Sequence, residues 1–132
     1  MSLDFLTPVN DAVLGIAALL PKQVIGKSLQ VHTEKNGFPE LENTRIAFFG
    51  VSESRNSYYP VMEYDTNSFR KEFYQLFPGN WSVNVADLGD LPSGEKPEDT
   101  YYALKEICLY LRQLNIIPIV LGGSQDLTVS LY

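Results

Sequence analysis

Apolar runs alternate with amphipathic segments through the second two-thirds of the chain. Residues 44–51 and 116–121 are almost continuously apolar, as is typical of parallel strands that helices cover on both faces. Residues 81–87 alternate between polar and apolar positions and predict a strand at or near the sheet edge. Residues 67–77 and 100–114 carry apolar side chains at helical spacing. This order predicts an α/β fold with a parallel sheet and right-handed crossovers.

The first third of the chain has a different character. We predict that residues 1–43 form a helix and an irregular lead-in, and that residues 44–132 form the βαβαβ part of the domain. Residues 11–20 predict a short apolar helix, capped by Asn10 or Asp11. The rest of the lead-in is polar and rich in turn residues, so no strand is predicted there.

Isolated residues of metal-binding type occur at two places. His32, the only histidine, has no second ligand type at metal spacing, and we interpret it as a solvated or hydrogen-bonded structural residue. Asp87 and Asp90 could serve acid–base or metal chemistry. Because neither a histidine nor a third carboxylate lies nearby, turn-forming residues are the favoured interpretation of this pair.

The segment after the last predicted strand combines features of a ligand site. Gly122-Gly123 permits a sharp turn, and Ser124 is placed to cap a helix that begins at Gln125. Asp126 in the first turn suits the helix dipole. Ligands of open α/β sheets bind at the carboxyl ends of the strands, so this turn predicts the location of a site without specifying its chemistry.

The loop after the first strand, residues 52–66, ends at the same side of the predicted sheet. Its polar candidates for substrate contact are Arg55, Asn56 and Ser57, because long loops at the carboxyl ends of strands often carry function. A solvated turn is the alternative interpretation of each of the three. No catalytic residue is assigned from the sequence.

Composition narrows the class of protein. The chain has 132 residues, of which 45% are hydrophobic. Its net charge is −6, and its ten basic residues are scattered along the sequence. That charge argues against nucleic-acid binding, and the apolar stretches are too short to span a membrane. The single cysteine, Cys108, excludes an internal disulfide and fits a reducing, cytoplasmic location. Its apolar neighbours predict a buried core thiol.

Several motifs resemble the ureohydrolases, the arginase, agmatinase and formimidoylglutamase family. Pro118-Ile119-Val120-Leu121-Gly122-Gly123 is similar to the family segment P-[IL]-V-L-G-G-D-H, and Asp87-Leu88-Gly89-Asp90 is similar to its D-x-G-D segment. Ser68-Phe69-Arg70 resembles the end of the family's G-P-x-x-[IL]-R helix. The resemblance spans residues 44–132 and is greatest to the formimidoylglutamase-like branch. It implies a three-layer αβα, Rossmann-like fold of arginase type.

The resemblance also implies a chemistry. In that family, the histidine after Gly-Gly-Asp is a ligand of a two-manganese centre that activates water against an amidine carbon. Aligned without a gap, Ser124 of this chain stands at the aspartate position and Gln125 at the histidine position. Gln125 and, with a shift of one residue, Asp126 are therefore the candidate metal ligands. The implied substrate is a small guanidino or formimino compound.

The resemblance also indicates what the chain lacks. The family's D-x-H-x-D and D-x-D ligands come after the matching segment, so we expect an incomplete amino-terminal part of the domain, inactive alone and without bound manganese. The open edge of its last strand predicts a homo-oligomer. Two other classes stay open: a non-catalytic ureohydrolase-like protein with a structural or regulatory role, and an unrelated nucleotide or anion binder that uses the helix after Gly123.

Overall fold

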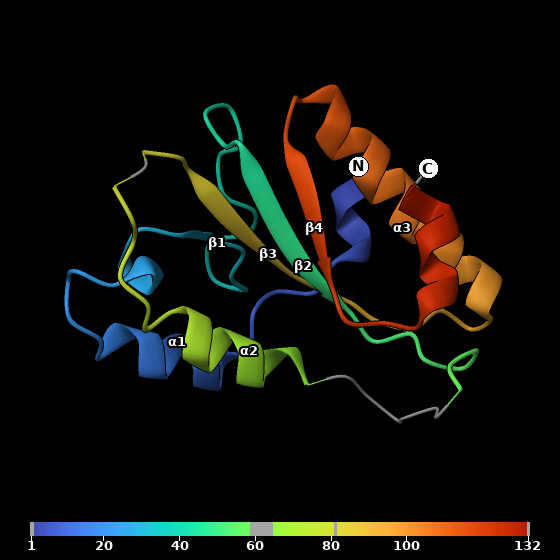
Figure 1. The fold of residues 1–132 in the computed structure, drawn as a ribbon, viewed down its shortest axis with the longest axis horizontal. Helices are drawn as coiled ribbons and strands as arrows, with labels where there is room; N and C mark the ends of the chain where they lie inside the picture. Colours follow the sequence, from blue (N-terminus) through green and yellow to red (C-terminus); the bar gives the residue numbers. More distant parts are fainter. Residues whose placement is uncertain (1, 59–64, 81, 132) are drawn as a thin grey trace.

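The computed structural model describes residues 2–58, 65–80 and 82–131. In these residues four strands form one parallel sheet, in the order β1-β3-β2-β4 (Figure 1). Their bounds are Gln30–Val31 for β1, Ile46–Val51 for β2, Val85–Leu91 for β3 and Ile117–Leu121 for β4. The α/β class and the parallel sheet are as predicted.

Three α-helices and three 3-10 helices accompany the sheet in the described residues. They are α1 (Asp11–Ala18), α2 (Thr66–Phe73), α3 (Pro97–Gln113), η1 (Ser2–Phe5), η2 (Ile25–Lys27) and η3 (Gln125–Leu131). Figure 1 shows α1 and α2 side by side on one side of the sheet, and α3, η1 and η3 together on the other. Among the described helices, none has the length and apolar character needed to cross a membrane.

Short polar side chains set the start of the first two helices. Asn10 caps α1, as predicted, because its Oδ1 accepts the N–H of Ala12 at 2.7 Å. Asp65 caps α2 in the same way. The third helix begins at Pro97, earlier than the predicted residue 100, because proline suits the first turn of a helix, where its missing N–H is not needed.

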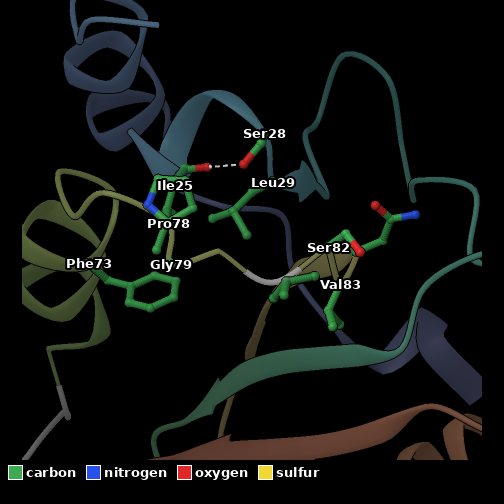
Figure 2. Close-up of a pocket in the computed structure, with 10 residues that line it drawn as sticks. Ile25, Ser28, Leu29, Phe73, Pro78, Gly79, Ser82 and Val83 are labelled. Atoms are coloured by element: carbon green, nitrogen blue, oxygen red, sulfur yellow. Dashed lines mark hydrogen bonds between the residues drawn. The ribbon is translucent and has the colours of Figure 1, made fainter. Parts of the chain in front are cut away.

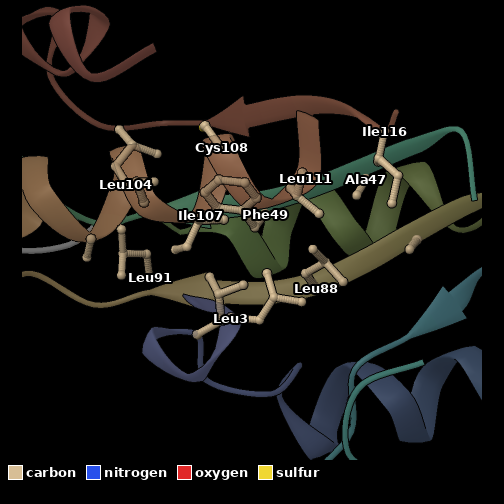
Figure 3. Close-up of a cluster of buried hydrophobic side chains, with 14 of the residues drawn as sticks. Leu3, Ala47, Phe49, Leu88, Leu91, Leu104, Ile107, Cys108, Leu111 and Ile116 are labelled. Carbon is tan, nitrogen blue, oxygen red and sulfur yellow. The ribbon is translucent and has the colours of Figure 1, made fainter. Parts of the chain in front are cut away.

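The larger core lies between α3 and one face of the sheet, and Figure 3 shows the side chains that fill it. Phe49 of β2 and Leu88 of β3 meet the buried residues of α3, and Leu3 of η1 closes one side. The α3 residues in this core are Ala103, Leu104, Ile107, Cys108 and Leu111. The helical spacing of the last four residues is part of the pattern that predicted the helix.

A smaller core lies on the opposite face of the sheet. Phe48 points away from Phe49 and packs with Val13 of α1 and with Tyr74 at the end of α2. Successive side chains of a strand point to opposite faces, so the continuous apolar run of β2 supplies both cores. This burial on both faces was predicted for β2.

The third strand is second from one edge of the sheet, in keeping with the prediction of a strand at or near the edge. β3 pairs with β2 on one side and, through Ala86 and Asp87, with β1 on the other. The two residues of β1 lie in the polar lead-in and are too few to give a periodic pattern, so sequence reasoning missed the strand that covers β3. Trp81, where the strand was predicted to begin, lies outside the described residues, and β3 begins at Val85.

Asp87 and Asp90 lie inside β3, so the prediction that they form a turn was wrong. Arg70 of α2 donates to Asp87 from Nε at 2.7 Å and from Nη2 at 3.0 Å, and to Asp90 from Nη1 at 3.0 Å. The side chains of Arg70 and Asp87 are both 0% exposed. The hydroxyl of Tyr74 also donates to Asp87. A buried charge is tolerated in a strand when a partner of opposite charge is fixed beside it.

Every N–H of the Arg70 guanidinium has an acceptor. Besides the two carboxylates, Nη2 donates to the carbonyl of Gly89 at 2.8 Å and Nη1 donates to the hydroxyl of Thr66 at 3.0 Å. Burial alone would lower the pKa of Arg70, but its hydrogen bonds to Asp87 and the charges of both carboxylates raise that pKa above its usual range. This network ties α2 to β3.

His32 has the structural role that was predicted for it. Its side chain is buried beside β1, with Nδ1 2.9 Å from the carbonyl oxygen of Leu88. Its ring stacks on Phe38 with 3.8 Å between the ring centroids. These contacts join the lead-in to β3.

The last strand is less covered than its apolar sequence predicted. On the α2 side of β4, Ile117 is 58% exposed and Ile119 is 43% exposed. The reason is the strand order: β4 is the edge strand beside β2, whereas the core on this face gathers around Phe48 and Tyr74. The prediction of helices on both faces of this strand was therefore wrong for the described residues.

Cys108 is buried in the core, as predicted, and burial raises the pKa of its thiol to about 11. We expect native protein at pH 8 to react with a disulfide reagent such as DTNB at least about 100-fold more slowly than protein in denaturant, because only the thiolate is the nucleophile. The absorbance of released thionitrobenzoate measures both rates. Equal rates in the two conditions would show that α3 does not bury this residue.

Candidate functional site

The loops that follow β2, β3 and β4 meet at the carboxyl ends of these strands, around Glu53. The Glu53 carboxylate is fully buried and accepts hydrogen bonds from Thr100 of α3 at 2.9 Å and from Arg55 Nε and Nη2 at 2.9 and 2.5 Å. Its backbone carbonyl accepts the N–H of Ser124 at 2.9 Å. Glu53, the second residue after the end of β2, thus connects α3 with the segment that follows β4.

Arg55 extends these connections to the loop after β3. Its guanidinium donates to the carbonyl oxygens of Gly94 and Glu95, each at 2.8 Å. Together with the two bonds to Glu53, these contacts hold the side chain against the protein while leaving 41% of it exposed. The bonds from Arg55 lower the pKa of Glu53 to about 2, because they stabilise the charged carboxylate.

The Gly-Gly turn after β4 has the backbone that its sequence predicts. Gly122 and Gly123 have φ angles of 78° and 80°, in a region of backbone conformation that residues with a Cβ rarely adopt. A Cβ at Gly123 would also lie 2.1 Å from Leu127 Cδ1. The turn leads into η3, a 3-10 helix that begins at Gln125, where a helix was predicted to begin. Ser124 is buried and bonded to Glu53, whereas a capping role was predicted for it.

Asp126, Tyr101 and Asn56 form a polar cluster next to this turn. The Asp126 Oδ2 atom accepts from the hydroxyl of Tyr101 and from Asn56 Nδ2, the latter at 3.3 Å. Asn56 Nδ2 also lies 2.8 Å from the Tyr101 hydroxyl. Partial burial would raise the pKa of Asp126, but the neighbouring polar groups of Ser124, Tyr101 and Asn56 lower it overall. Asp126 is therefore an anion at neutral pH.

The predicted site residues fall into three positions. Asn56 and Asp126 come together in the polar cluster, although they are far apart in sequence. Arg55 points to the loop after β3, and Ser57 lies in a turn where its N–H donates to the carbonyl of Ser54 at 2.9 Å. Gln125 is exposed. Part of the predicted substrate loop, residues 59–64, lies outside the described residues.

Sequence reasoning missed three residues of this region: Glu53, Thr100 and Tyr101. Glu53 could have been singled out, because it is a carboxylate close behind a buried strand and precedes an arginine by two residues. Thr100 and Tyr101 gave no such signal, since they lie in the first turns of an amphipathic helix. Only the crossover from β3 to β4 brings that helix end beside Asp126.

A separate hollow of about 330 Å³ lies near the amino end of β3 (Figure 2). Its wall contains apolar side chains such as Leu29 and Phe73, and Ser28 and Ser82 lie on its polar side. Val85, the first residue of β3, also lines this hollow. The hollow therefore lies at the opposite end of the strand from the polar cluster, which is at the carboxyl ends. It adds no group to that cluster.

Tyr101→Phe tests the polar cluster. Removing the hydroxyl takes a hydrogen bond from the Asp126 carboxylate, so we expect the pKa of Asp126 to rise and the free energy of unfolding to fall by about 1 kcal/mol. NMR titration of the Asp126 side-chain carboxyl measures the pKa. Tyr102→Phe is the matched control, because Tyr102 is 60% exposed. An unchanged Asp126 pKa in Tyr101→Phe would contradict the contact.

Comparison with known proteins provides no relative to guide the functional assignment. No family model, curated protein or solved structure matches the chain. Function is therefore inferred from the quoted motifs and from the geometry of the carboxyl-end loops.

Proposed function

We propose that this chain forms part of a ureohydrolase-like αβα domain and that the complete protein is a manganese-dependent hydrolase of linear amidines. The observation that carries the proposal is the polar cluster directly after the Gly-Gly turn, with the anionic Asp126 beside Asn56. It lies at the carboxyl ends of parallel strands, where α/β folds bind ligands. The turn itself carries the sequence that resembles the family.

The residues of this region can recognise a cationic amidine. One carboxylate oxygen of Asp126, Oδ2, is held by Tyr101 and Asn56, and the other, Oδ1, is buried and has no hydrogen-bond partner within residues 2–58, 65–80 and 82–131. An amidinium or guanidinium group offers N–H donors with positive charge, which a carboxylate accepts strongly. In the proposed function, Asp126 orients the substrate and Asn56 keeps the carboxylate in place.

The described residues by themselves do not provide a two-manganese site. Within the described parts of the chain, no three His, Cys, Asp or Glu side chains are grouped so that they could hold a metal ion. Gln125 is neutral and exposed, and Glu53 is already occupied by Arg55 and Thr100. A manganese centre needs several carboxylate and imidazole ligands. We therefore assign no catalytic step to this chain, and manganese would supply the activated water only with ligands from elsewhere.

Amidine turnover by the complete protein tests the proposal. We expect manganese-dependent release of urea or ammonia, or of formamide from formimino compounds, from at least one compound of a guanidino and formimino panel. The Asp126→Asn variant should raise the KM because it removes the anionic partner of the substrate. Glu95→Gln is the control for a nearby surface charge. Absence of turnover with every compound, at any manganese concentration, would contradict the hydrolase assignment.

A non-catalytic ureohydrolase-like protein is the second candidate, and Ser124 favours it. The N–H of Ser124 donates to the Glu53 carbonyl at 2.9 Å and its Oγ lies 3.4 Å from the same oxygen. Ser124 therefore has a structural role at the position where the family has an aspartate. Retention of ligand binding without turnover in the same panel would favour this second candidate over the hydrolase.

A further inference from the structure

The outer edge of β4 has no partner strand in the described residues. The N–H of Ile117 donates to the carbonyl of Arg45 at 2.8 Å, so the backbone groups of Ile117 point to β2. Because backbone direction alternates along a strand, those of Ile119 also point to β2, while those of Pro118 and Val120 point away from the sheet. The free edge therefore offers the Pro118 carbonyl and both backbone groups of Val120.

An apolar surface continues from this edge across the α2 side of the sheet. Ile117 is 58% exposed, and a hollow of about 380 Å³ beside it is lined by Ile119, Phe69, Val83 and other apolar side chains. Phe69 and Val83 are themselves about two-fifths exposed. An exposed strand edge beside an apolar face is the usual surface for association through strand pairing.

We propose that this edge pairs antiparallel with the same edge of a second copy of the chain, around a twofold axis at Val120. Proline determines the register. Placing Pro118 opposite Pro118 or opposite Val120 would leave carbonyl groups without donors, because proline has no N–H. With Val120 opposite Val120, both N–H groups and both carbonyls of this pair are satisfied. Pro118 then lies opposite Gly122, where the turn with φ 78° ends the strand.

The charges at the two ends of β4 complement one another in this register. Ile117, three residues before Val120, lies opposite Gly123, three residues after it. Arg45 and Arg112 line a shallow hollow with Ile117 at the amino end, and neither arginine has an ion pair within the described residues. The 3-10 helix η3, which begins two residues after Gly123, carries Asp126. The twofold axis thus places the arginine end of each copy beside the start of η3 in the other.

This pairing is independent of the proposed hydrolase function, and oligomeric state tests it. Sedimentation equilibrium of the 132-residue chain should show a reversible dimer whose dissociation constant rises with salt. Ile119→Lys should raise that constant about tenfold or more, because a charge on the joined apolar face must be desolvated. Leu109→Lys is the control, since Leu109 is similarly exposed, at 41%, but lies on α3.

Cross-linking tests the register in case a lysine variant fails to fold. Val120→Cys should form a disulfide-linked dimer under mild oxidation, because directly opposed residues of a hydrogen-bonded pair have Cα atoms about 5.5 Å apart. Ile119→Cys should cross-link at least about tenfold more slowly, and the buried Cys108 of the unchanged chain should not cross-link. A monomer at all concentrations, or faster cross-linking through position 119 than through position 120, would overturn the proposal.

Discussion

Replacing Arg70 by methionine is expected to lower the free energy of unfolding by about 3–5 kcal/mol. The change removes the cation that neutralises Asp87, whose side chain is 0% exposed. It also removes the donors of the Gly89 carbonyl bond and of the Asp90 bond. Methionine fills much of the same volume, so the loss arises from an uncompensated buried charge and not from a cavity. Urea denaturation followed by circular dichroism measures it.

Two further variants separate this effect from a general intolerance of substitution. Arg112→Met changes an exposed arginine without an ion pair among the described residues, and it should alter stability by less than about 0.5 kcal/mol. Combining Arg70→Met with Asp87→Asn should recover part of the stability, because the buried charge is then removed with its partner. A loss below about 1 kcal/mol in Arg70→Met alone would contradict the buried network.

Replacing Glu53 by glutamine is expected to remove part of the acid sensitivity of the fold. The pKa of Glu53 is about 2 in the folded chain and about 4.3 in an unfolded chain. A lowered folded pKa stabilises the protein above the unfolded pKa, and that stabilisation is lost as the pH falls through about 4 toward 2. The difference corresponds to at most about 3 kcal/mol. Because the Arg55 side chain is 41% exposed, we expect about 1–2 kcal/mol after screening by solvent.

The measurement is the free energy of unfolding as a function of pH from 7 to 2, for the unchanged chain and for Glu53→Gln. The variant should be less stable at pH 7 and should lose less stability on acidification. Glu95→Gln is the matched control in the adjacent loop, because Glu95 is exposed. Parallel stability curves for Glu53→Gln and the unchanged chain would show that Glu53 does not connect these loops.

The elements that could be predicted from the sequence are those in which one physical requirement dominates. The apolar run of β2 requires burial on both faces, and the helical spacing of Leu104, Ile107 and Leu111 requires one buried helix face. The turn at Gly122 and Gly123 follows from the positive φ angles that glycine accepts. In each case neighbouring residues alone carry the information, so no knowledge of the tertiary structure was needed.

The features that escaped prediction depend on contacts between distant segments. From the sequence, Asp87 was interpreted as a turn residue, because its partner, Arg70, lies on another element. The available signal was Arg70, a charged residue on the inner face of a short helix. Thr66 and Tyr74 lie one turn to either side of it. The exposure of β4 depends on strand order, which local periodicity does not encode. The cluster of Asn56, Tyr101 and Asp126 likewise requires the loop after β2, the start of α3 and η3 to meet.

The central claim is a ureohydrolase-like site at the Gly-Gly turn, and the metal content of the complete protein tests it most directly. The complete protein should be loaded with manganese, dialysed and analysed for metal, beside the Gln125→His variant. The account predicts close to two manganese ions per chain in the unchanged protein, as in the family that the turn resembles, with tighter retention in Gln125→His because imidazole is a stronger ligand than an amide. Absence of manganese from both the unchanged protein and Gln125→His would contradict it.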